Sequence, residues 1–478
     1  MRLTAGILPQ TTAYDPAEDP PGSVDPLGTV TGAEQLAEVL FPGVTARMWR
    51  VRLLTFAAVA SEVARRVNPA RRLDARLAFE RLFVSAVARQ EEADQAWKPA
   101  SRRLPGIGLA RQALRAGDQP LEKANFLKGQ GVNGPFGVIS RLARDVGVVN
   151  ESGELERAGT ELLLAWSADQ NLPGLLDDDV GREGADWIRK LVRQVSSYLD
   201  DRNSWPRKYW QGWEDLANRL RPDQPGSRER AVILKLLSAD PLGLRDRMVV
   251  CLTDPGVLSV YHSINASEDR GNLEREVLIR GVRAIRAQDE AGASIQVTVE
   301  LIDAYETLSG LLETMFRGLV WGLTRNSGQA ARSVILQEPA IRPFLAKIHT
   351  RIGSAAIRFQ KKLEAFEVDS LARKRGSVDI DRMHRLLDDS VAASRPGDDG
   401  VTAVMDRHVR VQKEKNKGVW IEQDKQWTLM PGFGDTGEEP QQYDWYLHPY
   451  RVTNIYGMLA DLEAVPRSGG GDAEEDLE

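Results

Sequence analysis

The amino-acid sequence predicts a mainly α-helical protein of several domains, with a small β hairpin near its C-terminus. Apolar side chains recur every three or four residues over long stretches, as at Leu53, Phe56 and Ala60, which is the spacing of an amphipathic helix. By contrast, GVWIEQDKQWTLMPG (418–432) holds two short alternating runs around a central Asp-Lys pair, a pattern typical of a hairpin. The length of 478 residues suits roughly two to four domains.

Changes in composition along the chain divide it into five segments. After an irregular start rich in Pro and Gly, helices are expected at 33–40, 45–67, 71–97, 185–199, 272–325 with a break at Gly292, and 355–377. The predicted domains are a helical N-terminal domain (1–97), a compact module (98–168), a helical scaffold (169–394), a region with a basic helix, the hairpin and many aromatic residues (395–465), and a disordered acidic tail (466–478).

The segment 108–167 has a local order of its own. Three helices are expected at Gly108–Ala116, Leu121–Lys128 and Pro135–Asp145, followed by two short strands at Val148–Val149 and Glu154–Glu156. This order, over about 60 of the 478 residues, resembles a winged helix-turn-helix module, in which a two-stranded wing follows the third helix. The resemblance implies that Pro135–Asp145 is a recognition helix.

The charge of this region is that of a nucleic-acid contact. Residues 98–145 contain nine Lys or Arg and three Asp or Glu, an excess of six positive charges in a chain whose net charge is −6. Such a local positive face is what phosphate binding requires. The resemblance implies that Ser140, Arg141 and Arg144 meet the DNA major groove. Phosphate contacts are expected from Arg111, Arg115, Lys123 and Lys128. We therefore expect a non-catalytic protein that binds duplex DNA.

Other functions remain open from the sequence. The predicted wing carries three glutamates against Arg157, whereas wings that follow phosphates carry Lys or Arg. This favours a protein-docking module, as in a structural subunit of a larger assembly. In its general look the chain also resembles uncharacterised bacterial proteins of phage-defence gene clusters, which implies a place in a defence or DNA-transaction complex. A metal-dependent nuclease would use C-terminal residues that have to meet in space: Asp398, Asp399, Glu414, Lys415 and Glu422.

The remaining motifs indicate neither a catalytic nor a cofactor site. GQGVNG (129–134) satisfies the dinucleotide pattern G-x-G-x-x-G, but a helical stretch precedes it where a buried strand is required, so a turn is favoured. Cys251 is the sole cysteine and the five histidines are scattered, which excludes a disulfide framework and a cysteine zinc site. We expect no cofactor and no bound metal.

Aromatic clusters and apolar runs complete the sequence-based expectations. The clusters at 205–213 and 443–450 have spacings typical of core or interface anchors, with base stacking as the less favoured alternative. The N-terminal sequence has no apolar signal-peptide core. The longest apolar run, 307–323, contains Glu313 and Arg317 and falls short of the ~20 residues that a membrane span needs. A cytoplasmic protein without membrane contact is therefore expected.

Overall fold

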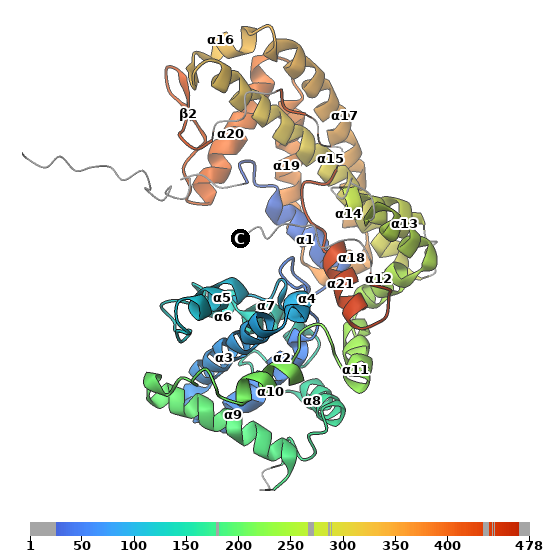
Figure 1. The fold of residues 1–478 in the computed structure, drawn as a ribbon. Helices are drawn as coiled ribbons and strands as arrows, with labels where there is room; N and C mark the ends of the chain where they lie inside the picture. Colours follow the sequence, from blue (N-terminus) through green and yellow to red (C-terminus); the bar gives the residue numbers. More distant parts are fainter. Residues whose placement is uncertain are drawn as a thin grey trace, which may run out of the picture. The chain divides into compact units, whose positions relative to one another are not determined.

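The computed structural model describes residues 25–177, 181–265, 272–284, 287, 289–433, 439–441, 443 and 445–467. Within these residues the chain forms twenty-one α-helices and three short strands (Figure 1), which confirms the predicted mainly α fold class. Most of the irregular start and of the acidic tail expected from the sequence lies outside the described residues. No helix in the described part of the chain has the length and apolar character needed to cross a membrane.

Contacts within the chain group the described residues into two units, each assembled from three separated segments. One unit draws on Met1–Gln35, Glu300–Val368 and Val378–His448, and the other on Leu36–Val299, Asp369–Ser377 and Pro449–Glu478. Helices α1 (Val30–Leu40) and α15 (Glu290–Arg325) each pass from one unit into the other. The linear domain boundaries expected at 97/98 and 394/395 stay predictions.

The larger unit carries the segment with the winged-helix resemblance. Its helices are α2 (Leu53–Arg66), α3 (Arg72–Ala93), α4 (Lys98–Ser101), α5 (Ile107–Arg115), α6 (Gln130–Asn133), α7 (Pro135–Asp145), α8 (Arg157–Asp169), α9 (Glu183–Asp200), α10 (Gly212–Arg219), α11 (Ser227–Ser238), α12 (Leu244–Thr253), α13 (Pro255–Asn265), α14 (Leu273–Glu276), α18 (Ser370–Arg375) and α21 (Val452–Asp461).

Helix α2 is the core helix of this unit, and one buried ion pair fixes where it begins. Its side chains are almost all buried, and α3, α7 and α8 pack against it. The Arg52 guanidinium donates to both carboxylate oxygens of Glu229 at 2.9 Å, and its remaining N–H groups reach two backbone carbonyls at the end of α10. Both side chains are at most 1% exposed. Thr55 also donates to Glu229, at 2.6 Å, so the pair is well satisfied by hydrogen bonds.

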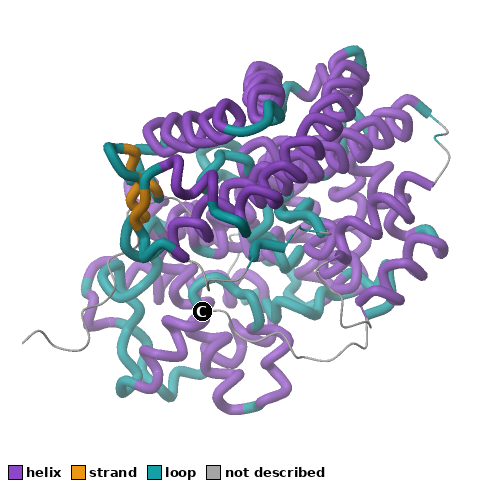
Figure 2. Tube along the Cα trace, turned by 90° about the horizontal axis from the view of Figure 1, so that it is seen from above, coloured by secondary structure: helices purple, strands orange, loops and turns teal. Residues whose placement is uncertain are grey.

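The smaller unit combines long helices with the predicted hairpin. Besides most of α15, it contains α16 (Arg332–Gln337), α17 (Ile341–Glu367), α19 (Ile380–Ala393) and α20 (Asp398–Glu414), with α19 packed on both α17 and α20. Strands β2 (Ile421–Gln423) and β3 (Trp427–Leu429) form the expected antiparallel hairpin, with Ile421 opposite Leu429. A further strand, β1 (Gln329–Ala330), pairs with β3 to give the order β1-β3-β2; Figure 2 shows these strands together among helices.

The helix expected at Leu121–Lys128 is not formed, and this expectation is wrong. The segment consists of turns and irregular backbone, and the one-turn helix α6 follows it. The reason is local, because the Asn125 side chain competes for backbone groups. Its Oδ1 accepts the N–H of Glu122 at 2.6 Å and its Nδ2 donates to the carbonyl of Pro120 at 2.9 Å.

The helix break expected at Gly292 lies earlier in the chain. Helix α15 begins at Glu290 and contains Gly292 in its first turn. There the Asp289 carboxylate accepts the N–H of Gly292 at 2.7 Å, which satisfies a backbone donor that has no partner within the helix. The glycine therefore belongs to the start of a helix of 36 residues.

The Arg52–Glu229 pair predicts a large and non-additive effect on stability. We expect Arg52→Met or Glu229→Gln alone to lower the free energy of unfolding by about 3–5 kcal/mol, because each leaves a buried charge without its partner. The double variant should lose less than the sum of the single losses. Urea unfolding followed by tryptophan fluorescence measures all three variants. Additive losses would show that the two side chains do not act as one unit.

Candidate nucleic-acid interface

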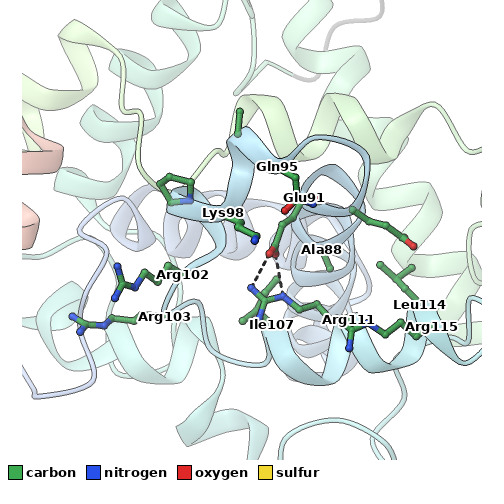
Figure 3. A pocket seen from close by; sticks show the side chains of 13 residues that line it. Ala88, Glu91, Gln95, Lys98, Arg102, Arg103, Ile107, Arg111, Leu114 and Arg115 are labelled. Carbon is green, nitrogen blue, oxygen red and sulfur yellow. Dashed lines mark hydrogen bonds and ion pairs between the residues drawn. The ribbon is translucent and has the colours of Figure 1, made fainter. Parts of the chain in front are cut away.

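A concave, cationic surface lies on the larger unit where α3 ends (Figure 3). The last turns of α3, together with α4 and α5, enclose a groove of about 890 Å³. Its charged lining consists of two carboxylates and five cationic side chains: Glu91, Glu92, Lys98, Arg102, Arg103, Arg111 and Arg115. All five cations come from the stretch 98–115, so they are part of the positive excess that the sequence shows.

The local sequence explains why the chain folds back on itself here. After α3, the Asp94 carboxylate accepts the N–H of Ala96 at 2.9 Å, which starts a tight turn. Pro99 stands in the first turn of α4, where its missing N–H costs nothing. Gly106 precedes α5 with a φ of 84°, a left-handed conformation that favours glycine. A Cβ at Gly106 would also meet the ring of Phe126 at 2.4 Å.

Arg111 holds α5 against α3 in the middle of the groove. Its Nη2 donates to Oε1 of Glu91 at 2.9 Å, and its Nε donates to Oε2 at 3.1 Å. Figure 3 shows this pair between the two helices. Such a two-point contact between a guanidinium and a carboxylate fixes both side chains. A ligand therefore reaches Arg111 only by sharing it with Glu91.

Lys98 and Arg115 carry the charges most available to a ligand. Both side chains are exposed, and neither forms an ion pair with any described residue. The Arg103 guanidinium lies over the ring of Trp49, 3.4 Å from its centroid, a contact that leaves the charge in place. Five cations against two carboxylates give the lining an excess of three positive charges.

The groove contains two of the four residues predicted to contact phosphate. Arg111 and Arg115 line it, whereas Lys123 and Lys128 are exposed in the connection between α5 and α6 and do not. Three further cations line the groove. They belong to the positive excess of residues 98–145, and no contact is predicted for them from the sequence: Lys98, Arg102 and Arg103.

The outward arginines of α7 are each paired with a carboxylate. Arg141 lies 2.9 Å from the buried Glu38, and Arg144 lies 2.8 Å from Glu151. The Ser140 hydroxyl donates to a backbone carbonyl one turn earlier, at 2.8 Å. Either arginine would have to leave its partner before it could reach a base edge. These three residues, predicted to contact the DNA major groove, therefore do not line the cationic groove of the protein.

Glu80 of α3 occupies the N-terminus of α7. One carboxylate oxygen accepts the N–H of Phe136 at 2.8 Å, and the other accepts the side-chain amide of Gln130 at 2.7 Å. The residue is 1% exposed, and this burial raises the pKa of Glu80 to about 7 although both hydrogen bonds and the nearby Arg81 and Arg76 lower it. The Phe136 N–H is thus already used by a carboxyl group of the protein itself.

The turn after α7 is closed by a single β-bridge, and acidic residues in it form ion pairs with arginines. Val149 and Leu155 form the bridge at the position of the two predicted wing strands. Two of the three wing glutamates have partners: Glu151 pairs with Arg144, and Glu154 pairs with Arg72. These ion pairs reduce the acidic character that the sequence indicates for the wing.

The residues considered for a metal-dependent nuclease are not gathered into a metal site. No group of three or more His, Cys, Asp or Glu residues that suits a metal ion is found among the described residues. Asp398 begins α20 and Glu414 ends it, about 24 Å apart at the helical rise of ~1.5 Å per residue. Asp398 also pairs with Arg332 at 2.6 Å, and Lys415 pairs with Asp25 at 2.7 Å.

Two buried carboxylates that shape this region were not anticipated from the sequence. Glu38 and Glu80 each stand inside an apolar run, AEQLAEVLFPG and LAFERLFVSAV. That position is the signal that could have revealed them, because a carboxylate in such a run has to find a partner when it is buried. Their partners lie far along the chain, at Phe136 for Glu80 and at Arg141 for Glu38.

Scans of the sequence against protein-family models, curated proteins and solved structures found no match. A candidate function for this chain therefore rests on the geometry of its own side chains.

Glu80 makes stability depend on pH in a predictable direction. Its pKa of about 7 in the folded protein lies above the ordinary value of 4.5, so the folded state binds this proton more tightly than the unfolded chain. This contribution is complete below about pH 4.5 and is lost as the pH rises through about 7. We expect Glu80→Gln to gain in melting temperature relative to the wild type as the pH is raised from about 5 to about 8, because an amide does not titrate.

Thermal unfolding at several pH values measures this difference. Glu92→Gln is the matched control, because Glu92 is exposed on the same helix; its difference from the wild type should stay constant with pH. A constant difference for Glu80→Gln as well would contradict the prediction.

Proposed function

We propose that this protein binds nucleic acid by the phosphate backbone, in the groove between α3, α4 and α5. The observation that carries the proposal is the gathering of five cationic side chains on one concave surface of a chain with a net charge of −6. A cleft lined mainly by one sign of charge focuses its field and attracts ions of the opposite sign. Lys and Arg contacts to phosphates supply the sequence-independent part of nucleic-acid affinity.

The cations follow the length of the groove and do not surround a single point. In the view of Figure 3, Arg102 and Arg103 lie at one end and Arg115 at the other, with Lys98 and Arg111 between them. A linear polyanion contacts several of these side chains at once, whereas a small anion reaches only some of them. This arrangement favours a nucleic-acid strand over a small anionic ligand.

The sequence suggests that the ligand is duplex DNA and that a winged-helix-like module binds it. In support, α5, α7 and the bridged turn follow one another in the order of such a module, with the one-turn helix α6 in place of the second helix expected at Leu121–Lys128. Docking of a partner protein by the same module is the second candidate function. It is favoured by the ion pairs of Arg141 and Arg144, which leave little free charge on the outward face of α7.

Reversing two groove charges is expected to remove most of the binding. Lys98→Glu with Arg115→Glu should weaken binding to a fluorescein-labelled, random-sequence duplex of about 20 base pairs by roughly tenfold or more at moderate salt. The slope of log affinity against log salt should fall by about 2, because each lost phosphate contact removes about 0.9. Fluorescence anisotropy titrations at several salt concentrations measure both quantities.

Lys123→Glu with Lys128→Glu is the matched control, since it makes the same change in net charge on exposed residues outside the groove. We expect it to reduce the affinity much less. An equal loss in both double variants would indicate diffuse attraction and contradict the assignment to the groove. A loss confined to Arg141→Glu with Arg144→Glu would assign the contact to α7. Absence of binding by the folded wild type at low salt would overturn the proposal and favour protein docking.

A further inference from the structure

The loop before α10 exposes one aromatic ring to solvent, and buried contacts hold this loop in place. In WPRKYWQGW (205–213), Trp213 is buried whereas Tyr209 is 88% exposed. The indole N–H of Trp213 donates to the carbonyl of Arg207 at 3.0 Å. The ring of Trp210 packs edge-on against that of Trp213, with the centroids 5.1 Å apart. Contacts on both sides of Tyr209 therefore hold the loop in place.

This loop is joined to one end of the cationic groove by a short series of contacts. Leu114, which lines the groove, accepts the N–H of Asp118 at 3.0 Å. The Asp118 carboxylate pairs with Arg89 of α3. The Arg89 guanidinium in turn lies over the ring of Trp213, 4.4 Å from its centroid. Arg89 therefore contacts both Asp118, next to the groove, and Trp213, which anchors the loop.

The residues that precede Tyr209 in the sequence are cationic. Arg207 and Lys208 are both exposed. An exposed aromatic ring among cations is the combination with which proteins bind single strands, because the cations contact the backbone while a base stacks on the ring. A ring whose loop is already fixed loses little conformational freedom when a base covers it. In a duplex, neighbouring base pairs already cover the faces of each base.

We propose that the groove and Tyr209 form one site for single-stranded nucleic acid, with phosphates on the groove cations and an unstacked base on the Tyr209 ring. This inference rests on the proposed function and names its ligand more closely. Electrostatic attraction alone ranks a duplex above a single strand of equal length, because the duplex carries two charged backbones. A higher affinity for the single strand would therefore indicate that the bases contribute to binding.

The test compares three fluorescein-labelled probes of about 20 units: oligothymidine, a chain of abasic sites, and a duplex. We expect the wild type to bind oligothymidine at least about fivefold more tightly than the other two probes. Tyr209→Ala should remove that preference, because one stacked base contributes roughly 5- to 150-fold in affinity. Tyr209→Phe keeps the ring and should behave as the wild type. The salt dependence should be unchanged in both variants, since neither removes a cation.

Leu164→Ala is the control for a general surface effect, because Leu164 is an exposed apolar side chain on α8. It should leave the preference intact. An oligouridine probe of the same length, bound with the same dependence on Tyr209, would support the site and extend it to RNA.

Four results would overturn the inference. Equal binding of oligothymidine and the abasic chain would contradict a base contact, and so would an unchanged preference in Tyr209→Ala. In both cases, salt-dependent binding through Lys98 and Arg115 would still support the proposed function. Binding of phosphatidylserine vesicles that depends on Tyr209, with no preference among the oligonucleotides, would assign the loop to a lipid surface. Absence of binding to any of the probes would overturn both the inference and the proposed function.

Discussion

The buried ion pair between Arg52 and Glu229 is the interaction on which the larger unit depends. It fixes the start of α2, and α3, α7 and α8 all pack against that helix. A charged pair without access to water is tolerated only when hydrogen bonds satisfy it, and here Thr55 and two backbone carbonyls complete the set. Since α3 forms one wall of the cationic groove, the position of the groove follows from the same buried contact.

The basic side chains of this unit divide into those that hold the fold and those that stay exposed at the groove. Arg111 ties α5 to α3 through Glu91, and Arg141 is paired with the buried Glu38. Arg115 and Lys98 remain exposed at the groove. A positive excess in the sequence therefore overstates the charge available to a ligand, because an ion pair inside the fold has already neutralised part of it.

Helix α3 has a structural role and also forms part of the proposed binding surface. Glu80 on this helix occupies the N-terminus of α7, and Arg89 connects the groove to the loop that carries Tyr209. On this helix, Glu80 thus occupies the N–H of Phe136, where an anion could otherwise bind, and Arg89 supports the loop that carries Tyr209. With the proposed contact in the groove and not on α7, the proposed ligand is a strand followed along its backbone, where the sequence suggests a duplex read by a helix.

Elements whose formation depends on neighbouring residues could be predicted from the sequence. The bounds of Pro135–Asp145 and the hairpin at 421–429 agree with expectation, because helical and strand periodicity are local properties. Local reasoning was wrong at Leu121–Lys128, where the Asn125 side chain competes for the backbone. The charges that stay available to a ligand could not be predicted in this way, because partners such as Arg141 and Glu38 are distant in sequence. Packing brings such residues together, and composition counts only their formal charges.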